Sequence, residues 1–265
     1  MIVWLNGSLI ESNEARIDPA ERGFLLGEGL FETIAVRAGA ALRVDDHLQR
    51  LAEGMALVGF ARPTYDLAGA IDAVRSANNL SEGCLRLTVS RGPAARGLLA
   101  PDQAPPTVLV TGVSCPVGDG IPLTAIIATT TRRNEFSPLS RIKSVNYLDG
   151  ILARQEAAAA GADEAILVNT RGLVVETTIA NLFLVLDGVA RTPAVEAGAL
   201  PGIMRAEILS RLDALQGTVT VDDLGNASEV FVTNALGVRP IVRIDGHSVG
   251  DGRPGPVTAS LSNLP

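Results

Sequence analysis

The chain has 265 residues, of which 47% are hydrophobic and 19% charged, so it can bury one large core or two ordinary ones, and a disordered chain is excluded. The 22 basic and 29 acidic residues give a formal charge of −7 without any basic tract, which argues against binding to nucleic acid or to anionic membranes. The start of the sequence lacks the basic and apolar regions of a signal peptide, and no apolar stretch is long enough to span a bilayer, so we expect a soluble cytoplasmic protein.

Residues 1–115 predict a small α+β domain. Residues 4–10 read as a strand, a turn and a strand, and residues 29–44 read as a longer hairpin. Two helices should follow, the first with Asp45 as its N-cap and its end near Gly59, and the second starting at Thr64. Strands over residues 84–91 and 107–113 complete this half.

A Pro- and Gly-rich segment then predicts a linker over residues 116–122 and a larger second domain over residues 123–265. After a β-rich run at 123–131, residues 144–161 have helical periodicity with Gly161 as the stop. Strands between 164 and 188, a Pro-initiated helix at 201–215 and a strand at 229–234 follow. We therefore expect an α/β protein of two mixed α+β domains, with a cleft between them that suits a small-molecule site.

The ratio of arginine to lysine singles out one residue that could act as a nucleophile. Of the 22 basic residues, 21 are arginine, and Lys143 is the one lysine. A guanidinium stays protonated and cannot act as an amine nucleophile, whereas a desolvated lysine can form a Schiff base. From the count alone, a functional lysine and a lysine that persists by chance on a solvated face are equally compatible with the sequence.

The surroundings of Lys143 decide between these readings. The segment K-S-V-N-Y-L at 143–148 is followed by V-V-E-T-T-I-A-N-L-F around Glu176, then by L-P-G-I-M-R at 200–205 and V-F-V-T-N-A-L at 230–236. With E-R-G-F-L-L-G-E-G-L-F-E-T-I at 21–34 and H-L-Q-R-L at 47–51, the chain resembles the class IV aminotransferases over about residues 4–240. These are pyridoxal-phosphate enzymes of fold type IV, and they include branched-chain and D-amino-acid aminotransferases and 4-amino-4-deoxychorismate lyase.

The resemblance implies pyridoxal phosphate in the cleft between two domains, and a homodimer in which the second subunit closes the site. Lys143 would hold the cofactor as a Schiff base and shuttle protons. Glu176 matches the carboxylate that keeps the pyridine nitrogen protonated, with a solvated Glu in a turn as the alternative. Arg50 matches the phosphate-binding arginine, although an isolated Arg on an amphipathic helix would more often lie at the surface.

Further cofactor contacts follow from the same resemblance. The backbone amides of Ile203 and Met204 would bind the phosphate at a helix start. Relatives often carry Thr or Ser where this chain has Met204, so a hydroxyl contact is lost, and Thr233 and Asn234 would supply replacement polar contacts. Tyr147 would reach the ring hydroxyl, with a buried Tyr bonded to backbone as the alternative.

The remaining histidines and cysteines predict no further chemistry. His47 has no acidic partner in view and is expected to be structural, and His247 is expected to be exposed. Cys84 and Cys115 have neither metal-ligand nor disulfide-framework spacing, so no metal site is expected.

The reaction is the least determined point, because one cofactor supports transamination, racemisation and elimination. S-R-G-P-A-A-R-G at 90–97 and T-N-A-L-G-V-R-P at 233–240 resemble segments of 4-amino-4-deoxychorismate lyase, which makes 4-aminobenzoate and pyruvate in folate biosynthesis; Leu98 replaces its usual aromatic residue. The alternative is a transaminase of D-amino acids or branched-chain L-amino acids with 2-oxoglutarate, in which Arg96 or Arg91 holds the carboxylate. The R-x-H pattern of D-amino-acid enzymes is absent, and the substrate residues we expect are Phe31 and Arg96. A non-catalytic protein that keeps the fold is a third possibility, against which Lys143, Glu176 and Arg50 argue.

Overall fold

The computed structural model describes residues 1–99, 104–115, 120–262 and 264. The chain forms two compact units, one of Met1–Val117 with Ile142–Asn146 and one of Gly118–Arg141 with Tyr147–Pro265. Both units mix helices and strands, which confirms the predicted fold class. Residues 116–119 of the predicted linker lie outside the described residues. The predicted boundaries place Lys143 in the second domain, whereas the segment that carries it packs with the first unit.

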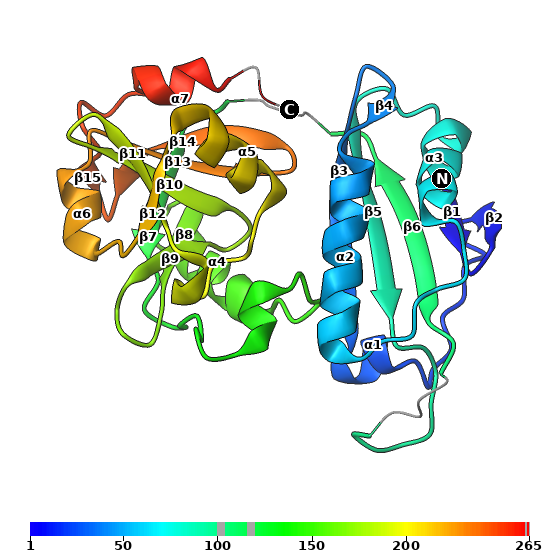
Figure 1. The fold of residues 1–265 in the computed structure, drawn as a ribbon. Helices are drawn as coiled ribbons and strands as arrows, with labels where there is room; N and C mark the ends of the chain where they lie inside the picture. The colour runs from blue at the N-terminus through cyan, green and yellow to red at the C-terminus, as the bar shows by residue number, and fades with distance from the viewer. Residues whose placement is uncertain (100–103, 116–119, 263, 265) are drawn as a thin grey trace. The chain divides into compact units, whose positions relative to one another are not determined.

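The first unit is built on a six-stranded antiparallel sheet of order β2-β1-β6-β5-β3-β4. Helices α2 and α3 pack against the sheet (Figure 1), and apolar side chains of both helices share one core with the strands. The elements are β1 (Ile2–Leu5), β2 (Ser8–Glu11), α1 (Arg22–Leu26), β3 (Gly29–Arg37), β4 (Ala40–Ala41), α2 (Val44–Val58), α3 (Leu67–Ala77), β5 (Gly83–Ser90) and β6 (Thr107–Val113).

The two predicted helix starts in this unit are wrong by one to a few residues. The N-cap of α2 is Arg43 in a left-handed conformation (φ 54°), and Asp45 lies in the first turn, where its charge suits the helix dipole. The N-cap of α3 is Asp66, whose side chain accepts a hydrogen bond from the Gly69 amide (3.0 Å), a stronger cap than the predicted Thr64. The predicted end of α2 is confirmed by Gly59 (φ 67°).

The second unit contains a nine-stranded sheet of order β12-β11-β10-β13-β14-β7-β8-β9, and β15 pairs with β14. Because β9 also pairs with β10, the strands β10, β13, β14, β7, β8 and β9 close into a ring. The elements are β7 (Leu123–Ile127), η1 (Pro138–Arg141), α4 (Leu148–Ala159), β8 (Glu164–Val168), β9 (Val174–Thr177), β10 (Asn181–Leu186), β11 (Val189–Pro193), η2 (Val195–Ala197), α5 (Ile203–Leu212), β12 (Leu215–Gly217), α6 (Val221–Asn226), β13 (Glu229–Asn234), β14 (Gly237–Ile244), β15 (His247–Ser248) and α7 (Pro256–Ser260).

Two features of this unit differ from the sequence analysis or add to it. Helix α5 begins at Ile203 rather than at Pro201 and ends at Leu212, where Asp213 turns left-handed (φ 47°). The tail after Gly246 is held in place by Glu229 of β13. This buried carboxylate accepts hydrogen bonds from the Val257 amide (2.9 Å) and the Thr258 amide (2.8 Å), which anchors α7 to β13. None of the helices among the described residues is long and apolar enough to cross a bilayer.

Candidate functional site

The backbone around Lys143 is fastened to β3. The Phe31 amide donates to the Lys143 carbonyl (2.9 Å), and the Val145 amide donates to the Gly29 carbonyl (3.0 Å). The half-buried Lys143 Nζ lies 4.4 Å from the centroid of the Phe31 ring, which also carries the Arg86 guanidinium at 3.6 Å. The structure therefore brings the predicted residues Lys143 and Phe31 into contact, and cation–π attraction orders the amine at the ring.

A buried carboxylate, which sequence reasoning missed, holds Arg50. Glu32 on β3 is 1% exposed and accepts hydrogen bonds from Arg50 Nε (2.9 Å) and Nη2 (2.5 Å). His47 Nδ1 lies 2.7 Å from Glu32 Oε2, so the expectation that His47 lacks an acidic partner is wrong, although the residue is buried as expected of a structural histidine. The partner was hidden because Glu32 and the helix that carries Arg50 lie apart in sequence and meet only when α2 packs on β3.

The contacts of Glu32 set its ionisation. Burial alone would raise the pKa of the Glu32 carboxyl, but the hydrogen bonds and charges of His47 and Arg50 outweigh it and hold the pKa below its ordinary value of 4.5. A carboxyl whose pKa is lowered on folding stabilises the fold above its unfolded pKa, and that contribution is lost as the pH falls through the folded pKa.

We expect Glu32→Gln to lower the free energy of unfolding at pH 7 by about 3 kcal/mol, because it removes the buried carboxylate that pairs with the half-buried Arg50 guanidinium. Denaturant titrations between pH 7 and pH 3 would measure the free energy of unfolding of both proteins. The wild-type protein should lose stability as the pH falls below 4.5, and the variant should lose less over the same range. Glu53→Gln, which removes a carboxylate from the exposed side of the same helix, is the matched control. Parallel pH profiles for the wild type and Glu32→Gln would contradict the assignment.

In the second unit, Glu176 lies buried on β9 rather than in a solvated turn. Its Oε2 accepts hydrogen bonds from the Leu200 amide (3.0 Å) and from Asn181 Nδ2 (3.3 Å). Its Oε1 lies 2.9 Å from Arg133 Nη2, and the Arg133 side chain also donates to the carbonyls of Gly198 (3.2 Å) and Ser140 (3.0 Å). The side chain is thus held from two sides.

The start of α5 lies beside this carboxylate. Its N-cap, Gly202, offers no side chain to the first-turn amides, and that turn holds no acidic residue. A Cβ at Gly202 would lie 1.9 Å from Asn181 Oδ1, so only glycine allows the helix start to approach Asn181 this closely. Met204 is 3% exposed and packs in the apolar cluster with Phe183 and Phe231, so this position contributes core packing and an amide rather than a hydroxyl.

The other predicted cofactor residues lie in the same unit. Thr233 pairs with Asn181 across β13 and β10, in the same row as Glu176, and its hydroxyl donates to the Gly237 carbonyl (3.3 Å). Asn234 Oδ1 accepts from the Leu236 amide (2.9 Å), so the turn after β13 uses both polar side chains. Tyr147 is half-buried at the N-cap of α4.

The two candidate substrate arginines differ in their surroundings. Arg91 donates to the carbonyls of Gly59 (2.6 Å) and Val58 (2.9 Å) and to Glu28 (2.8 Å), so its guanidinium is committed to holding the fold. Arg96 is exposed on the loop that follows. Arg96 rather than Arg91 is thus the candidate for a substrate carboxylate, and His247 is exposed as expected.

The predicted residues form two groups, one in each unit. The first contains Lys143, Phe31, Arg50 and Arg96, and the second contains Glu176, Tyr147, Thr233, Asn234 and the α5 start at Ile203 and Met204. Their chemistry fits pyridoxal phosphate: one amine, a buried carboxyl group paired with an arginine, a second arginine and a helix start without a side-chain cap. Arg133 and Asn181, which hold Glu176, were not singled out from the sequence. Asn181 lies in the same quoted motif as Glu176, five residues after it, whereas no local pattern marks Arg133.

Comparison with known proteins shows the family of the chain. The model of the amino-transferase class IV family matches residues 29–244. The chain belongs to the class IV aminotransferases. It is therefore a pyridoxal-phosphate-dependent enzyme, as the resemblance implied.

Three proteins illustrate the range of this similarity. The D-alanine aminotransferase of Bacillus licheniformis is 33% identical over 98% of this chain and 94% of its own. The branched-chain amino acid aminotransferase of Escherichia coli superposes with a TM-score of 0.91 at 26% identity and covers 98% of this chain and 91% of its own. A Legionella pneumophila protein provisionally named 4-amino-4-deoxychorismate lyase has a TM-score of 0.86 at 33% identity and covers 95% of both chains.

Proposed function

We propose that this enzyme is a 4-amino-4-deoxychorismate lyase, which releases pyruvate and 4-aminobenzoate. The observation that carries the proposal is the loop S-R-G-P-A-A-R-G, residues 90–97, which resembles the loop of that enzyme. Its two glycines adopt backbone conformations that favour glycine, at Gly92 (φ 95°) and Gly97 (φ 143°), and a Cβ at Gly92 would lie 2.0 Å from the Pro105 carbonyl. The similarity to the provisionally named lyase supports the same reading.

The residues of the chain have distinct proposed roles. Bound pyridoxal phosphate supplies an electron sink for the charge that develops when a proton leaves the substrate carbon. Glu176, fixed by Leu200 and Asn181, holds a proton at the pyridine nitrogen. Arg50, kept in place by Glu32, and the first amides of α5 bind the phosphate. We assign Tyr147 to the ring hydroxyl, and Thr233 and Asn234 to further polar contacts.

The reaction follows from what Lys143 can do as a base. Its Nζ takes the proton from the ring carbon that bears the substrate amine. The bond between the ring and the ether oxygen then breaks with its electron pair on oxygen, and the six-membered ring becomes aromatic. The three-carbon unit leaves as the enolate of pyruvate, and its terminal carbon takes up the proton that Lys143 holds, which gives pyruvate and restores the amine. Aromatisation supplies the driving force, so the reaction consumes no keto acid and all atoms of the substrate appear in the two products.

The second candidate is a transaminase of D-amino acids or branched-chain L-amino acids with 2-oxoglutarate. The similarity to the B. licheniformis D-alanine aminotransferase favours it. Arg96, exposed on its loop, would hold the substrate carboxylate by a bidentate contact.

The test uses purified protein, pyridoxal phosphate and 4-amino-4-deoxychorismate, with no keto acid present. We expect pyruvate and 4-aminobenzoate in equal amounts, and no product from Lys143→Ala. No product from a cofactor-loaded wild-type protein would refute the lyase. A parallel panel of D- and L-amino acids with 2-oxoglutarate would then show whether the protein is a transaminase.

We also propose a homodimer as the working form. Several large apolar side chains of the first unit are exposed, among them Phe24 at 80%, Leu98 at 84% and Leu99 at 95%. Large apolar side chains exposed in this number suit burial in a protein interface. Sedimentation equilibrium of the active protein should give twice the chain mass, and an active monomer would contradict the proposal.

A further inference from the structure

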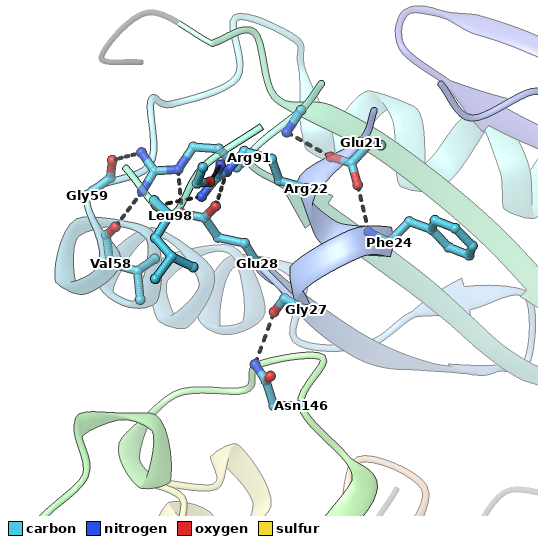
Figure 2. A network of polar contacts seen from close by, with 12 residues as sticks. Glu21, Arg22, Phe24, Gly27, Glu28, Val58, Gly59, Arg91, Leu98 and Asn146 are labelled. Atoms are coloured by element: carbon cyan, nitrogen blue, oxygen red, sulfur yellow. Dashed lines mark hydrogen bonds and ion pairs between the residues drawn. The ribbon is translucent and has the colours of Figure 1, made fainter. Parts of the chain in front are cut away.

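The Glu28 carboxylate lies between two arginines of the first unit (Figure 2). Its Oε1 pairs with Arg91 Nε (2.8 Å), and its Oε2 pairs with Arg22 Nε. The Arg22 side chain is 4% exposed and that of Arg91 14% exposed, so the two guanidinium groups depend on this carboxylate for charge compensation.

The other nitrogens of the Arg22 guanidinium donate hydrogen bonds to the loop that carries Arg96. Its Nη1 donates to the Gly97 carbonyl and its Nη2 to the Leu98 carbonyl, both at 2.7 Å. The planar fork of a guanidinium matches two successive carbonyls and a carboxylate at once, which a single ammonium cannot do. The backbone directly after Arg96 is thereby tied to a buried side chain of α1.

The start of the same loop is held as well. Arg91 connects Glu28 to the end of α2 through the carbonyls of Val58 and Gly59 (Figure 2). The Gly92 amide donates to Glu21 Oε1 (2.8 Å). Both ends of the stretch around Arg96 are therefore fastened to α1 and its flanking residues.

The network also reaches the segment of Lys143. Asn146 Nδ2 donates to the carbonyl of Gly27 (3.0 Å), the residue before Glu28. Gly27 is left-handed (φ 68°), and a Cβ there would lie 2.7 Å from Asn146 Oδ1. Residues 27 and 28 thus contact both the Lys143 segment and the arginines that hold the Arg96 loop.

From these contacts we infer that Glu28 is a positioning residue that acts through Arg22 to fix Arg96 for a carboxylate of the substrate. The inference rests on the proposed function, since both candidate substrate classes carry a carboxylate. Without the Glu28 charge, the buried Arg22 guanidinium has no counter-ion, and its shift toward water releases the carbonyls of Gly97 and Leu98.

The first measurement needs no substrate. Trypsin cleaves after arginine, and the bond between Arg96 and Gly97 becomes a substrate only when the loop opens locally. We expect Glu28→Gln to raise the rate of appearance of fragments 1–96 and 97–265 roughly tenfold or more, the effect of losing a charge-assisted hydrogen bond. Arg22→Lys, which keeps the charge but loses the fork, should do the same. Glu53→Gln, an exposed carboxylate of α2, should leave the rate unchanged.

The second measurement is kinetic and uses the cofactor-loaded enzyme with whichever substrate the wild type turns over. Glu28→Gln should raise KM roughly tenfold with kcat nearly unchanged, and Arg96→Ala should raise KM further. Unchanged cleavage at Arg96 in both Glu28→Gln and Arg22→Lys would show that Glu28 and Arg22 do not hold the loop. Faster cleavage with an unchanged KM would overturn the positioning role of Glu28. A wild type inactive on both substrate classes would refute the proposed function instead. The cleavage rates are measured without substrate, so they would still show whether Glu28 and Arg22 hold the loop.

Discussion

Replacing Lys143 with alanine should lower turnover roughly 10³-fold or more and remove the visible absorbance of the cofactor-loaded protein. Lys143 is the one lysine of the sequence, so no other side chain offers a primary amine. Its Nζ lies against the Phe31 ring and its backbone is tied to β3, which keeps the amine half-buried at a fixed position. Absorbance spectra and single-turnover rates would measure both effects.

Lys143→Arg is the matched control for charge. It keeps a cation beside the Phe31 ring, so stability should stay close to that of the wild type. The guanidinium is not an amine nucleophile, so activity should be as low as in Lys143→Ala. Activity near the wild-type level in either variant would contradict the role of this lysine.

Glu176→Gln should keep the cofactor bound and coloured but lower kcat by about two orders of magnitude. The glutamine can still accept a hydrogen bond from the Leu200 amide, so the local geometry survives. It carries no charge, so it can neither hold a proton at the pyridine nitrogen nor balance Arg133. Rapid-mixing kinetics and a cofactor titration would separate chemistry from binding.

A matched control exists in the same unit. Glu164 is also a buried carboxylate, and its side-chain partners are Arg154 and Thr178 rather than a predicted site residue, so Glu164→Gln removes the same charge without removing a site contact. We expect this control to lose stability while kcat changes little. Equal losses of kcat in the two variants would mean that Glu176 acts only through folding.

The sequence alone singles out the two residues with the strongest chemical signature, and their roles stay predictions. Lys143 stands out because it is the single lysine, and Glu176 because it lies in a segment that resembles the family. Burial of Glu176 was less predictable, since it depends on β9 pairing with both β8 and β10. The β9–β10 pairing places Asn181 opposite Glu176, only five residues away, and Asn181 lies in the same quoted motif. The pairing of Glu176 with Arg133 joins segments far apart in sequence and left no local signal.

Other misses have two physical causes, tertiary packing and local capping. Glu32 and His47 meet because α2 packs on β3, and Glu229 anchors α7 from a strand far away in sequence. Helix starts were misplaced where a neighbouring group capped better, as Asp66 does for α3, or where a left-handed residue such as Arg43 preceded the helix. Local patterns predict elements well, whereas the partners of buried charges are set by tertiary packing.

The most direct test is to locate the cofactor on the chain. Pyridoxal phosphate bound to the wild-type protein is captured by reduction with borohydride, and the modified peptide is identified by mass spectrometry. We expect one adduct per chain, on Lys143, with the half-exposed N-terminal amine of Met1 unmodified. An adduct on Met1 alone, or no adduct on a protein that turns over substrate, would contradict it.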